Sequence, residues 1–438
     1  MRLDSEYHLK EYETIDNFKK THRNVFCKFS DYGLTIDCSA FYPGIEQFYG
    51  TGSNPLIRVQ NIKDNRIEYD TCEMLPFLSS DYKTLKWVEA GDIVITKGGS
   101  IGFVGYVTKS ALASRDLIFI KSSVIDTAFS KYLFLYFSTK FAYKQLIRSS
   151  SQVAQPHLTI TLVKDFDIFK ASDRLIQIVA NLYDKSERTL EESKQLYAAA
   201  EDQLLSELGL KDWQPKNKNI NVKTLKESFL SSGRLDAEYY QSKYDEIEKH
   251  LKKHNQTDLL VNVCFVNQAN IKPNDKEQYK YIELANINTM GEITGCTIDY
   301  GENLPTRARQ VVKSGDVIVS SIEGSLDSCA LVTPEYDNAF CSTGFYIIRS
   351  KIITNETLLV LMKLKPIQQL LKKGCSGTIL TAINYDNFCN IIIPIPDGKI
   401  QTEISIKIQR CFALKAESKR LLAEAKMMVE NEIEKGGE

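Results

Sequence analysis

The chain has 438 residues, of which 43% are hydrophobic and 25% charged, and a formal net charge of -1. This composition is ordinary for a globular protein with room for two to four domains, and the charge argues neither for nor against a nucleic-acid partner. The apolar runs are too short to span a bilayer, no secretory signal follows Met1, and the ten cysteines form no C-x-x-C pair. We therefore expect a cytoplasmic protein with reduced thiols rather than a membrane, zinc or disulfide protein.

The chain begins with a stretch that occurs again later. RLDSEYHLKEYETIDNFKK from Arg2 matches RLDAEYYQSKYDEIEKHLKK from Arg234, which indicates an internal repeat of about 225 to 230 residues. Each copy is expected to be a short extended lead followed by an amphipathic helix. The Arg2–Asp4 and Arg234–Asp236 pairs are interpreted as salt bridges at the start of the helix.

The stretch that follows each copy has the pattern of a mixed α/β domain. In the first half, segments 56–62 and 66–70 are separated by a polar Lys-Asp-Asn turn and predict a hairpin. A Gly-Asp turn, a β-branched strand, a Gly/Ser-rich loop and another strand then follow in 87–107. The second half repeats this order in 281–299 and 310–332. Residues 132–148 and 357–373 predict matching short helices, and a polar loop with a strand closes each half at 149–169 and 374–396.

Each half then ends in a long predicted helix. Apolar or small residues recur every three or four positions through 172–210 and again from about 400, which is typical of a coiled-coil seam. The two helices share a string, EESKQLYAAA from Glu191 and AESKRLLAEA from Ala416. Two long helices with one pattern and a polar outer face are expected to pack on each other.

These observations predict an α+β fold with a pseudo-two-fold internal repeat. Two similar mixed α/β domains alternate with two long helices that form an antiparallel coiled coil. The expected boundaries are 1–20 for the N-terminal lead, 21–170 for the first domain, 171–210 for the central helix, 211–254 for a linker and second lead, 255–396 for the second domain and 397–438 for the C-terminal helix.

The ordered repetition of these motifs resembles the DNA-specificity subunits of Type I restriction-modification enzymes. The likeness rests on the paired Gly-Asp-strand-Gly loops, the Asn-Ile turns at Asn61 and Asn286, the RLD-x-EYY string and the IPIP-to-Gln junction that ends at Gln401. It covers nearly the whole chain. The first junction, VKDFDIFKASD, lacks the two prolines of the second, which puts only the local chain path in doubt.

The resemblance implies a function and a set of partners. Each domain would be a target-recognition domain that reads one part of a bipartite, asymmetric site in double-stranded DNA. The coiled coil would dock two methyltransferase subunits, and restriction subunits with motor and nuclease activity would join the complex. No cofactor is expected on this chain, whereas S-adenosylmethionine, ATP and Mg²⁺ are expected on the partners.

Candidate DNA-contacting residues are hydrogen-bonding or basic side chains at predicted loop tips, the types that read base edges and hold phosphates. In the first domain they are Arg58, Lys63, Arg66, Lys97, Gly98, Gly99, Ser100, Arg115, Arg148, Gln152, Gln155 and His157. In the second they are Asn288, Arg307, Arg309, Ser320, Ser321, Glu323, Gly324, Ser325, Lys372, Lys373, Ser376 and Thr378. The Lys97-Gly-Gly-Ser loop lacks the spacing of a P-loop, so nucleotide binding there is not expected.

The sequence carries no recognisable catalytic motif. We find no methyltransferase cofactor loop or Asn/Asp-Pro-Pro-aromatic tetrad, no nuclease carboxylate cluster, and no zinc-ligand spacing among the five histidines. The chain is therefore expected to be a non-catalytic subunit with no metal site. Two alternatives stay open: a coiled-coil scaffold that binds proteins, and the recognition part of a fused methylase-nuclease system.

Overall fold

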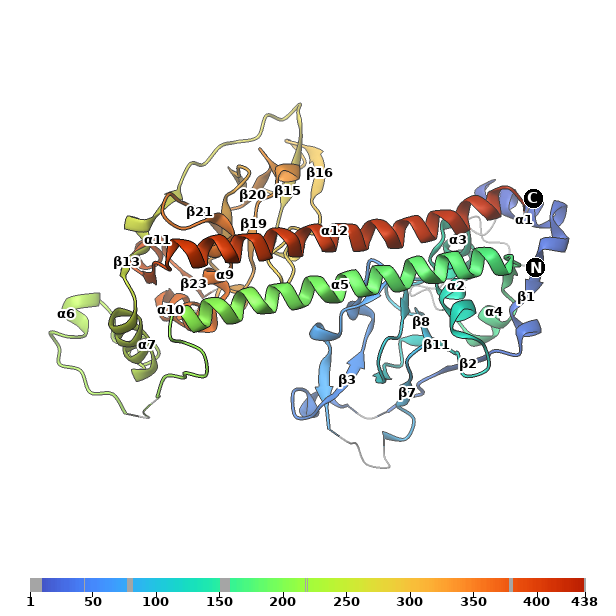
Figure 1. Cartoon of the computed structure of the whole chain (residues 1–438), viewed down its shortest axis with the longest axis horizontal. Coiled ribbons are helices and arrows are strands. Elements are labelled where there is room, and N and C mark those ends of the chain that lie inside the picture. The colour runs from blue at the N-terminus through green and yellow to red at the C-terminus, as the bar shows by residue number, and fades with distance from the viewer. Residues whose placement is uncertain are drawn as a thin grey trace. The chain divides into compact units, whose positions relative to one another are not determined.

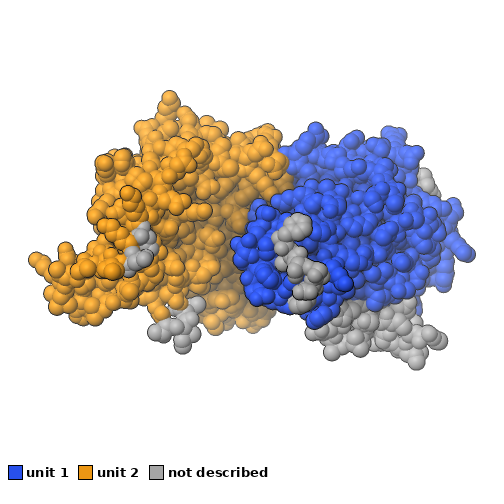
Figure 2. Space-filling view, turned by 90° about the horizontal axis from the view of Figure 1, so that it is seen from below, with its two compact units in different colours: residues 1–189, 417–438 blue, residues 190–416 orange. Residues whose placement is uncertain are grey.

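The computed structural model describes residues 10–42, 44–76, 82–149, 158–216, 218, 220–377 and 381–436. The chain folds into two compact units, residues 1–189 with 417–438 and residues 190–416 (Figure 2). Two long helices, α5 (Asp173–Glu207) and α12 (Gly398–Glu434), each contribute one part to either unit. Ser172 caps the start of α5, since its hydroxyl accepts a hydrogen bond from the Leu175 amide at 3.3 Å.

Unit 1 contains helices and strands in the order expected of a mixed α/β domain. They are α1 (Lys10–Thr21), β1 (Phe26–Lys28), β2 (Thr35–Cys38), β3 (Asn54–Ile57), β4 (Ile62–Lys63), β5 (Arg66–Ile67), β6 (Glu73–Leu75), β7 (Lys86–Val88), β8 (Ile93–Thr96), β9 (Val104–Tyr106), β10 (Ala111–Ala113), β11 (Leu117–Lys121), α2 (Thr127–Ser138), α3 (Lys140–Ser149), α4 (Ile160–Lys164) and β12 (Asp167–Phe169).

Unit 2 follows the same order after the linker. Its elements are α6 (Phe229–Ser232), α7 (Ser242–His254), β13 (Thr257–Leu259), α8 (Leu260–Val263), β14 (Cys264–Asn267), β15 (Gln278–Ile282), β16 (Thr297–Tyr300), β17 (Ala308–Val311), β18 (Val317–Ser320), β19 (Cys329–Leu331), β20 (Phe340–Ser342), β21 (Phe345–Ser350), α9 (Asn355–Lys363), α10 (Lys365–Gly374), β22 (Cys375–Ser376), β23 (Ala382–Ile383), α11 (Tyr385–Cys389) and β24 (Ile392–Pro394).

The sheet topology confirms the internal repeat. Unit 1 has two four-stranded sheets in the orders β6-β3-β10-β7 and β2-β11-β8-β9, and unit 2 has β16-β15-β20-β17 and β14-β21-β18-β19. One pair in each unit, β3 with β10 and β15 with β20, is parallel. A short antiparallel pair, β1 with β12 and β13 with β24, completes each unit. The fold is therefore α+β with two copies of one domain, as the sequence predicts.

Both Gly-Asp turns enter a buried strand through the same local structure. Gly91 and Gly315 have φ of +99° and +88°, which only glycine adopts without strain. The next residue buries its carboxylate: Asp92 forms an ion pair with Lys121 at 2.8 Å and Asp316 with Arg349 at 2.6 Å. Each carboxylate also accepts a hydrogen bond from a turn amide. A buried carboxylate needs these partners, and they fix the strand that leads into the Gly/Ser-rich loop.

The helices after the sheets differ from the prediction. Instead of one short helix in 132–148 and one in 357–373, each unit has two, α2 with α3 and α9 with α10. The breaks fall at Thr139 and Leu364, whose backbones are extended. Thr139 caps α3 through its hydroxyl. Pro366 is the second residue of α10, where proline suits the first turn of a new helix.

The hairpin predicted in the first half is also shorter than expected. A one-turn 3-10 helix, Val59–Asn61, interrupts the chain after β3, so only β4 and β5 pair around Asp64 and Asn65. Both turn residues have positive φ, 48° and 57°, as a two-residue turn of this type requires.

The long helices α5 and α12 lie side by side and run in opposite directions (Figure 1). Ser186 contacts Ser418, and Ser193 contacts Cys411, so the position on α12 falls as the position on α5 rises. Most residues of the predicted seam are buried, among them Val179, Leu204, Ile408 and Ala425. The antiparallel coiled coil is thus confirmed, and each end of it joins the hydrophobic core of one unit.

Candidate nucleic-acid interface

In unit 1 three candidate segments meet at the carboxyl end of β8. The Lys97 amide donates to the Asp116 carbonyl oxygen at 2.9 Å, and the Leu158 amide donates to the Lys97 carbonyl oxygen at 3.0 Å. These two hydrogen bonds place the Gly-rich loop beside Arg115 and beside the chain at Leu158. Lys97 is half-buried, whereas Gly99, Ser100 and Arg115 are exposed. We call residues 97–100, 115 and 116 the unit 1 loop cluster.

In unit 2 the same hydrogen bonds occur with different residues. The Ser321 amide donates to the Gly344 carbonyl oxygen, and the Ile383 amide donates to the Ser321 carbonyl oxygen, each at 2.8 Å. Strand register gives the equivalence, because Thr96 faces Leu117 in one unit and Ser320 faces Phe345 in the other. Lys97 therefore corresponds to Ser321. Residues 321–325, 343 and 344 form the unit 2 loop cluster.

The two loop clusters carry different chemistry at equivalent positions. A lysine at 97 is replaced by a serine at 321, and Arg115 by Thr343. In unit 2 Arg307 lies beside Thr343 instead, since the Arg307 carbonyl oxygen accepts a hydrogen bond from the Thr343 amide at 2.9 Å. Glu323 forms an ion pair with Lys372 at 3.4 Å. One scaffold thus presents two different sets of donors and acceptors.

Ser320, the last residue of β18, and two serines of the unit 2 loop cluster form hydrogen bonds that shape the loop. Ser320 is buried, and its hydroxyl lies 3.0 Å from that of Ser325. The Ser321 hydroxyl donates to the Gly344 carbonyl oxygen at 2.9 Å. These contacts hold the loop in one shape, and they leave Gly324 and the nearby Ser376 exposed.

Arg58 and Arg307 each contact a tyrosine and a glutamate. Arg58 forms an ion pair with Glu73 at 3.1 Å and lies 5.1 Å above the Tyr49 ring. Its buried Nε has no hydrogen-bond partner among the described residues. Arg307 hydrogen-bonds the Tyr281 hydroxyl at 3.2 Å and pairs with Glu283 at 3.0 Å. The guanidinium of Arg307 is more than half exposed, so it is the more accessible of the two.

Other predicted residues lie elsewhere and serve other contacts. Arg66 lies against the long helices, where it contacts Ser186 and Ser418. Arg148 pairs with Asp16 on α1 at 2.8 Å, and Lys373 pairs with Glu248 on α7 at 2.6 Å. The structure does not bring these three side chains to the loop clusters. Each is mostly buried, and we read each as part of the packing between helices and sheets.

The remaining candidates are placed as follows. Lys63 is exposed in the β4–β5 turn and pairs with Glu68 at 3.1 Å. Asn288 closes a turn through its hydrogen bond to Glu292 at 2.8 Å. Arg309 is half-buried on β17. Gln152, Gln155, His157 and Thr378 lie outside the described residues.

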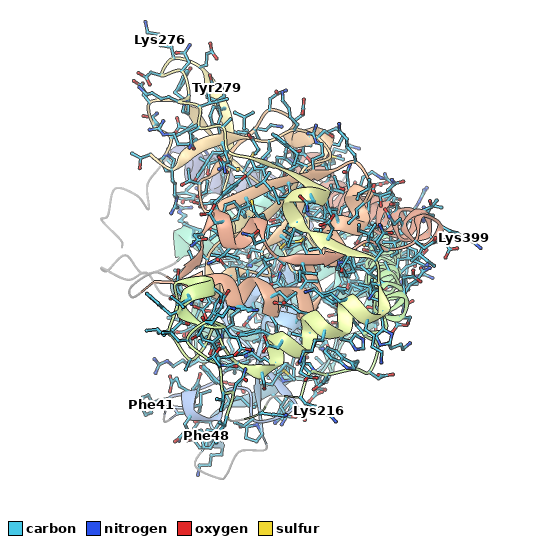
Figure 3. The ribbon with its side chains drawn as sticks, turned by 90° about the vertical axis from the view of Figure 1, so that its left-hand side faces the viewer. Phe41, Phe48, Lys216, Lys276, Tyr279 and Lys399 are labelled. Carbon is cyan, nitrogen blue, oxygen red and sulfur yellow. The ribbon has the colours of Figure 1, made fainter. Side chains whose placement is uncertain are left out.

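Sequence reasoning missed an exposed aromatic side chain beside the unit 1 loop cluster. Phe41 is 77% exposed, and the next residue, Tyr42, lies with its hydroxyl 3.5 Å from the Arg115 amide. Burial raises the pKa of the Tyr42 hydroxyl, so it stays protonated and neutral at this edge. Phe41 and the neighbouring Phe48 lie at the periphery in Figure 3. The sequence around Phe41 gives no signal that distinguishes an exposed aromatic side chain from a buried one.

The part of the chain that the structure describes contains neither a cluster of metal-ligating side chains nor a membrane-spanning helix. No three His, Cys, Asp or Glu side chains come together there as metal ligands. No described helix is both long enough and apolar enough to cross a membrane.

Comparison with known proteins finds similar sequences and similar folds. The chain is 23% identical over 164 residues to the Type I restriction enzyme HindI specificity subunit of Haemophilus influenzae, a stretch that covers 36% of this chain and only 32% of that protein. Its fold is similar to the crystal structure of a Type I restriction-modification S subunit from M. genitalium, with 12% identity, 94% and 96% of the two chains covered and a TM-score of 0.42. The HsdS subunit from Thermoanaerobacter tengcongensis is similar over 94% and 97% of the chains, with 15% identity and a TM-score of 0.30.

A family model matches both halves of the chain. The Type I restriction modification DNA specificity domain matches residues 41–169 and again residues 260–426. The two matched stretches include both loop clusters and together make up more than half of the chain. This protein therefore belongs to the family of Type I restriction-modification DNA specificity proteins, with one specificity domain in each half of the chain.

Proposed function

We propose that this chain is the DNA sequence-specificity subunit of a Type I restriction-modification complex and reads a bipartite, asymmetric DNA site. One observation carries the proposal: the specificity domain occurs twice, and the two copies present different side chains at equivalent positions of their loop clusters. Two similar scaffolds with Lys97 and Arg115 in one and Ser321 and Thr343 in the other fit two different DNA sequences.

The side chains suggest a division of roles. Lys97 fits a phosphate contact, because an ammonium on a flexible stem neutralises charge without reading sequence. Arg115 and Arg307 fit base contacts, since a guanidinium can donate two hydrogen bonds to the O6 and N7 atoms of guanine. Glu323 can accept a hydrogen bond from a cytosine amine, and the exposed backbone of Gly99 and Ser100 can approach the DNA closely.

The chain itself would be non-catalytic and would bind no cofactor. Its partners would be double-stranded DNA, two methyltransferase subunits and restriction subunits, with S-adenosylmethionine, ATP and Mg²⁺ bound to those partners. The internal repeat supports two copies of the methyltransferase, because two like surfaces on one chain fit two copies of one partner. A methyltransferase that acts on a base takes it out of the stack, so this chain would supply register and orientation.

Genome-wide mapping of methylated adenines tests the proposal. The chain is co-expressed with its candidate methyltransferase subunit in a host without other adenine methylation, and the DNA is sequenced by a single-molecule method. The proposal predicts one motif of two different parts with a fixed gap. If no motif is found and the purified complex does not bind DNA, the chain is a scaffold for proteins. Methyl transfer by the purified chain alone would show an enzyme instead.

A further inference from the structure

We propose that Phe41 in unit 1 and Ile271 in unit 2 are apolar base-contacting residues that help to set the sequence preference of their domains. The proposal rests on the proposed function and adds to it a kind of contact that hydrogen-bonding candidates cannot make. The shared chemistry is an apolar side chain against an apolar part of a base, either the 5-methyl group of thymine or the face of an unstacked base.

The two residues occupy equivalent positions in the repeat. Asp37 on β2 faces Phe119 on β11, and Asn267 on β14 faces Ile347 on β21. Phe119 and Ile347 in turn face Val94 and Ile318, which lie two positions after the matching aspartates Asp92 and Asp316. Phe41 follows Asp37 by four positions, and Ile271 follows Asn267 by four. In both units a large apolar residue therefore follows the same edge strand, three residues after the end of β2 and four residues after the end of β14.

Both side chains are exposed although their backbones are held in place. Phe41 is 77% exposed and Ile271 48%. The Phe41 carbonyl oxygen accepts the Thr84 hydroxyl at 2.7 Å, and two residues earlier the buried Ser39 hydroxyl donates to the Ala113 carbonyl oxygen at 2.6 Å. The Ile271 amide donates to the Arg309 carbonyl oxygen at 2.7 Å. A single exposed apolar residue is common, but an anchored one that recurs in both copies suggests a contact surface.

The surroundings of both residues suit DNA rather than another apolar surface. The Arg115 amide lies 3.5 Å from the hydroxyl oxygen of Tyr42, the residue after Phe41, and the Lys97 amide donates to the carbonyl oxygen of Asp116, the residue after Arg115. Ile271 is bonded to Arg309 and followed by the exposed Lys272. An apolar side chain can approach a base while basic residues of the same edge hold phosphates.

The test uses the complete complex of this chain with its modification subunits. Phe41→Ala, Ile271→Ala and the control Phe265→Ala are compared with the unchanged chain in the methylation motif and in affinity for a duplex that carries the site. Phe265 is a matched control because it is also a largely exposed residue, 70%, on strand β14. Since all three side chains are exposed, equal thermal unfolding is expected and confirms that the variants fold.

The proposal predicts a different change for each variant. Phe41→Ala should relax at least one base position in one part of the motif and lower affinity at least about fivefold. Ile271→Ala should relax the other part, and Phe265→Ala should change neither. Phe41→Leu should keep most of the preference because it keeps an apolar side chain.

Two modified duplexes distinguish the two sources of the contact. If Phe41 contacts a thymine methyl, uracil in place of that thymine weakens the unchanged complex but not Phe41→Ala. If Phe41 enters a base step, 2-aminopurine at that step becomes fluorescent only with the unchanged chain. The proposal is overturned if Phe41→Ala has the same motif and affinity as Phe265→Ala. It is also overturned if Phe41→Ala loses affinity but neither the uracil duplex nor the 2-aminopurine duplex gives the expected response. If the unchanged complex has no motif, the proposed function itself fails.

Discussion

Ser186 on α5 and Ser418 on α12 bond reciprocally across the coiled coil. The Ser186 hydroxyl donates to the Ser418 carbonyl oxygen at 2.8 Å, and the Ser418 hydroxyl donates to the Ser186 carbonyl oxygen at 2.6 Å. Arg66 donates to both hydroxyl oxygens, at 2.5 and 2.9 Å. Glu187 lies 3.3 Å from the same guanidinium. Arg66, on strand β5, is thus hydrogen-bonded to both long helices at one point.

Removal of Arg66 should therefore destabilise the chain and leave DNA contacts unchanged. Arg66→Ala removes the donor to two buried hydroxyls and the ion pair with Glu187, which should cost about 2 to 4 kcal/mol of unfolding free energy. Urea denaturation measures this loss. Lys63→Ala, in the same hairpin with an exposed ion pair, should cost less than about 1 kcal/mol. A loss as small for Arg66→Ala would show that the side chain is dispensable to the fold.

Asp167 should make the stability of unit 1 depend on acid. Burial alone raises the pKa of its carboxyl, but hydrogen bonds and charges from Lys19 and Lys28 outweigh burial and leave the pKa below its ordinary value. Its stabilising effect is fully present above the unfolded pKa of about 3.9 and is lost as pH falls through the folded pKa.

The expected result is a stability difference that shrinks on acidification. The chain should be more stable than its Asp167→Asn variant at pH 6, and the gap should close as the pH falls from about 4 to lower values. Urea denaturation at several pH values measures both proteins. A gap that stays constant over this range would mean that the lysines do not hold the ionised carboxylate.

The thiols should be unreactive in the folded protein. The structure places seven of the ten cysteines in buried positions, and burial raises the pKa of Cys264, Cys329 and Cys341 to about 12. Only a thiolate reacts with a disulfide reagent. At pH 8 a chromogenic disulfide reagent should therefore react slowly with few thiols of the native chain. In urea it should react rapidly with all ten. Rapid modification of Cys329 in the native state would contradict its placement.

The basic residues of the unit 1 loop cluster should contribute to salt-dependent DNA binding. Lys97→Ala should lower affinity for all sequences and reduce the slope of log affinity against log salt by about one. Lys185→Ala, on the exposed side of α5, serves as a control and should change the slope little. Titration of a labelled duplex at several salt concentrations gives both slopes. An unchanged slope for Lys97→Ala would remove this residue from the interface.

The repeat and the long helices could be predicted because they leave a periodic signal. The seam of α5 and α12 alternates at helical spacing, and the Gly-Asp turns recur with the same strand after them. The Arg234–Asp236 ion pair predicted from the repeated Arg-Leu-Asp string is present at 2.7 Å, but it lies before α7 rather than at the start of that helix, which begins at Ser242. Arg2 and Asp4 lie outside the described residues. These features depend on local sequence, so one chain suffices to find them.

The break between paired helices and the role of Arg66 could not be predicted. Thr139 ends one helix and caps the next only because its hydroxyl reaches the Ala142 amide, and the apolar pattern continues across it. Arg66 has the residue type and turn position of a DNA contact, yet the packing of its hairpin directs it to Ser186 and Ser418. The exposure of a large apolar side chain could not be predicted either, because only the fold shows that Phe41 is exposed while Phe29 is buried.

Exchange of one recognition domain tests the central claim most directly. Residues 21–165 are replaced by the corresponding residues of another family member, and methylated adenines are mapped in cells that also produce the methyltransferase subunit. If each unit reads its own sequence, one part of the motif should change while the other part and the gap stay the same. A motif that is unchanged, or that changes in both parts, would contradict a reading of DNA by two independent units.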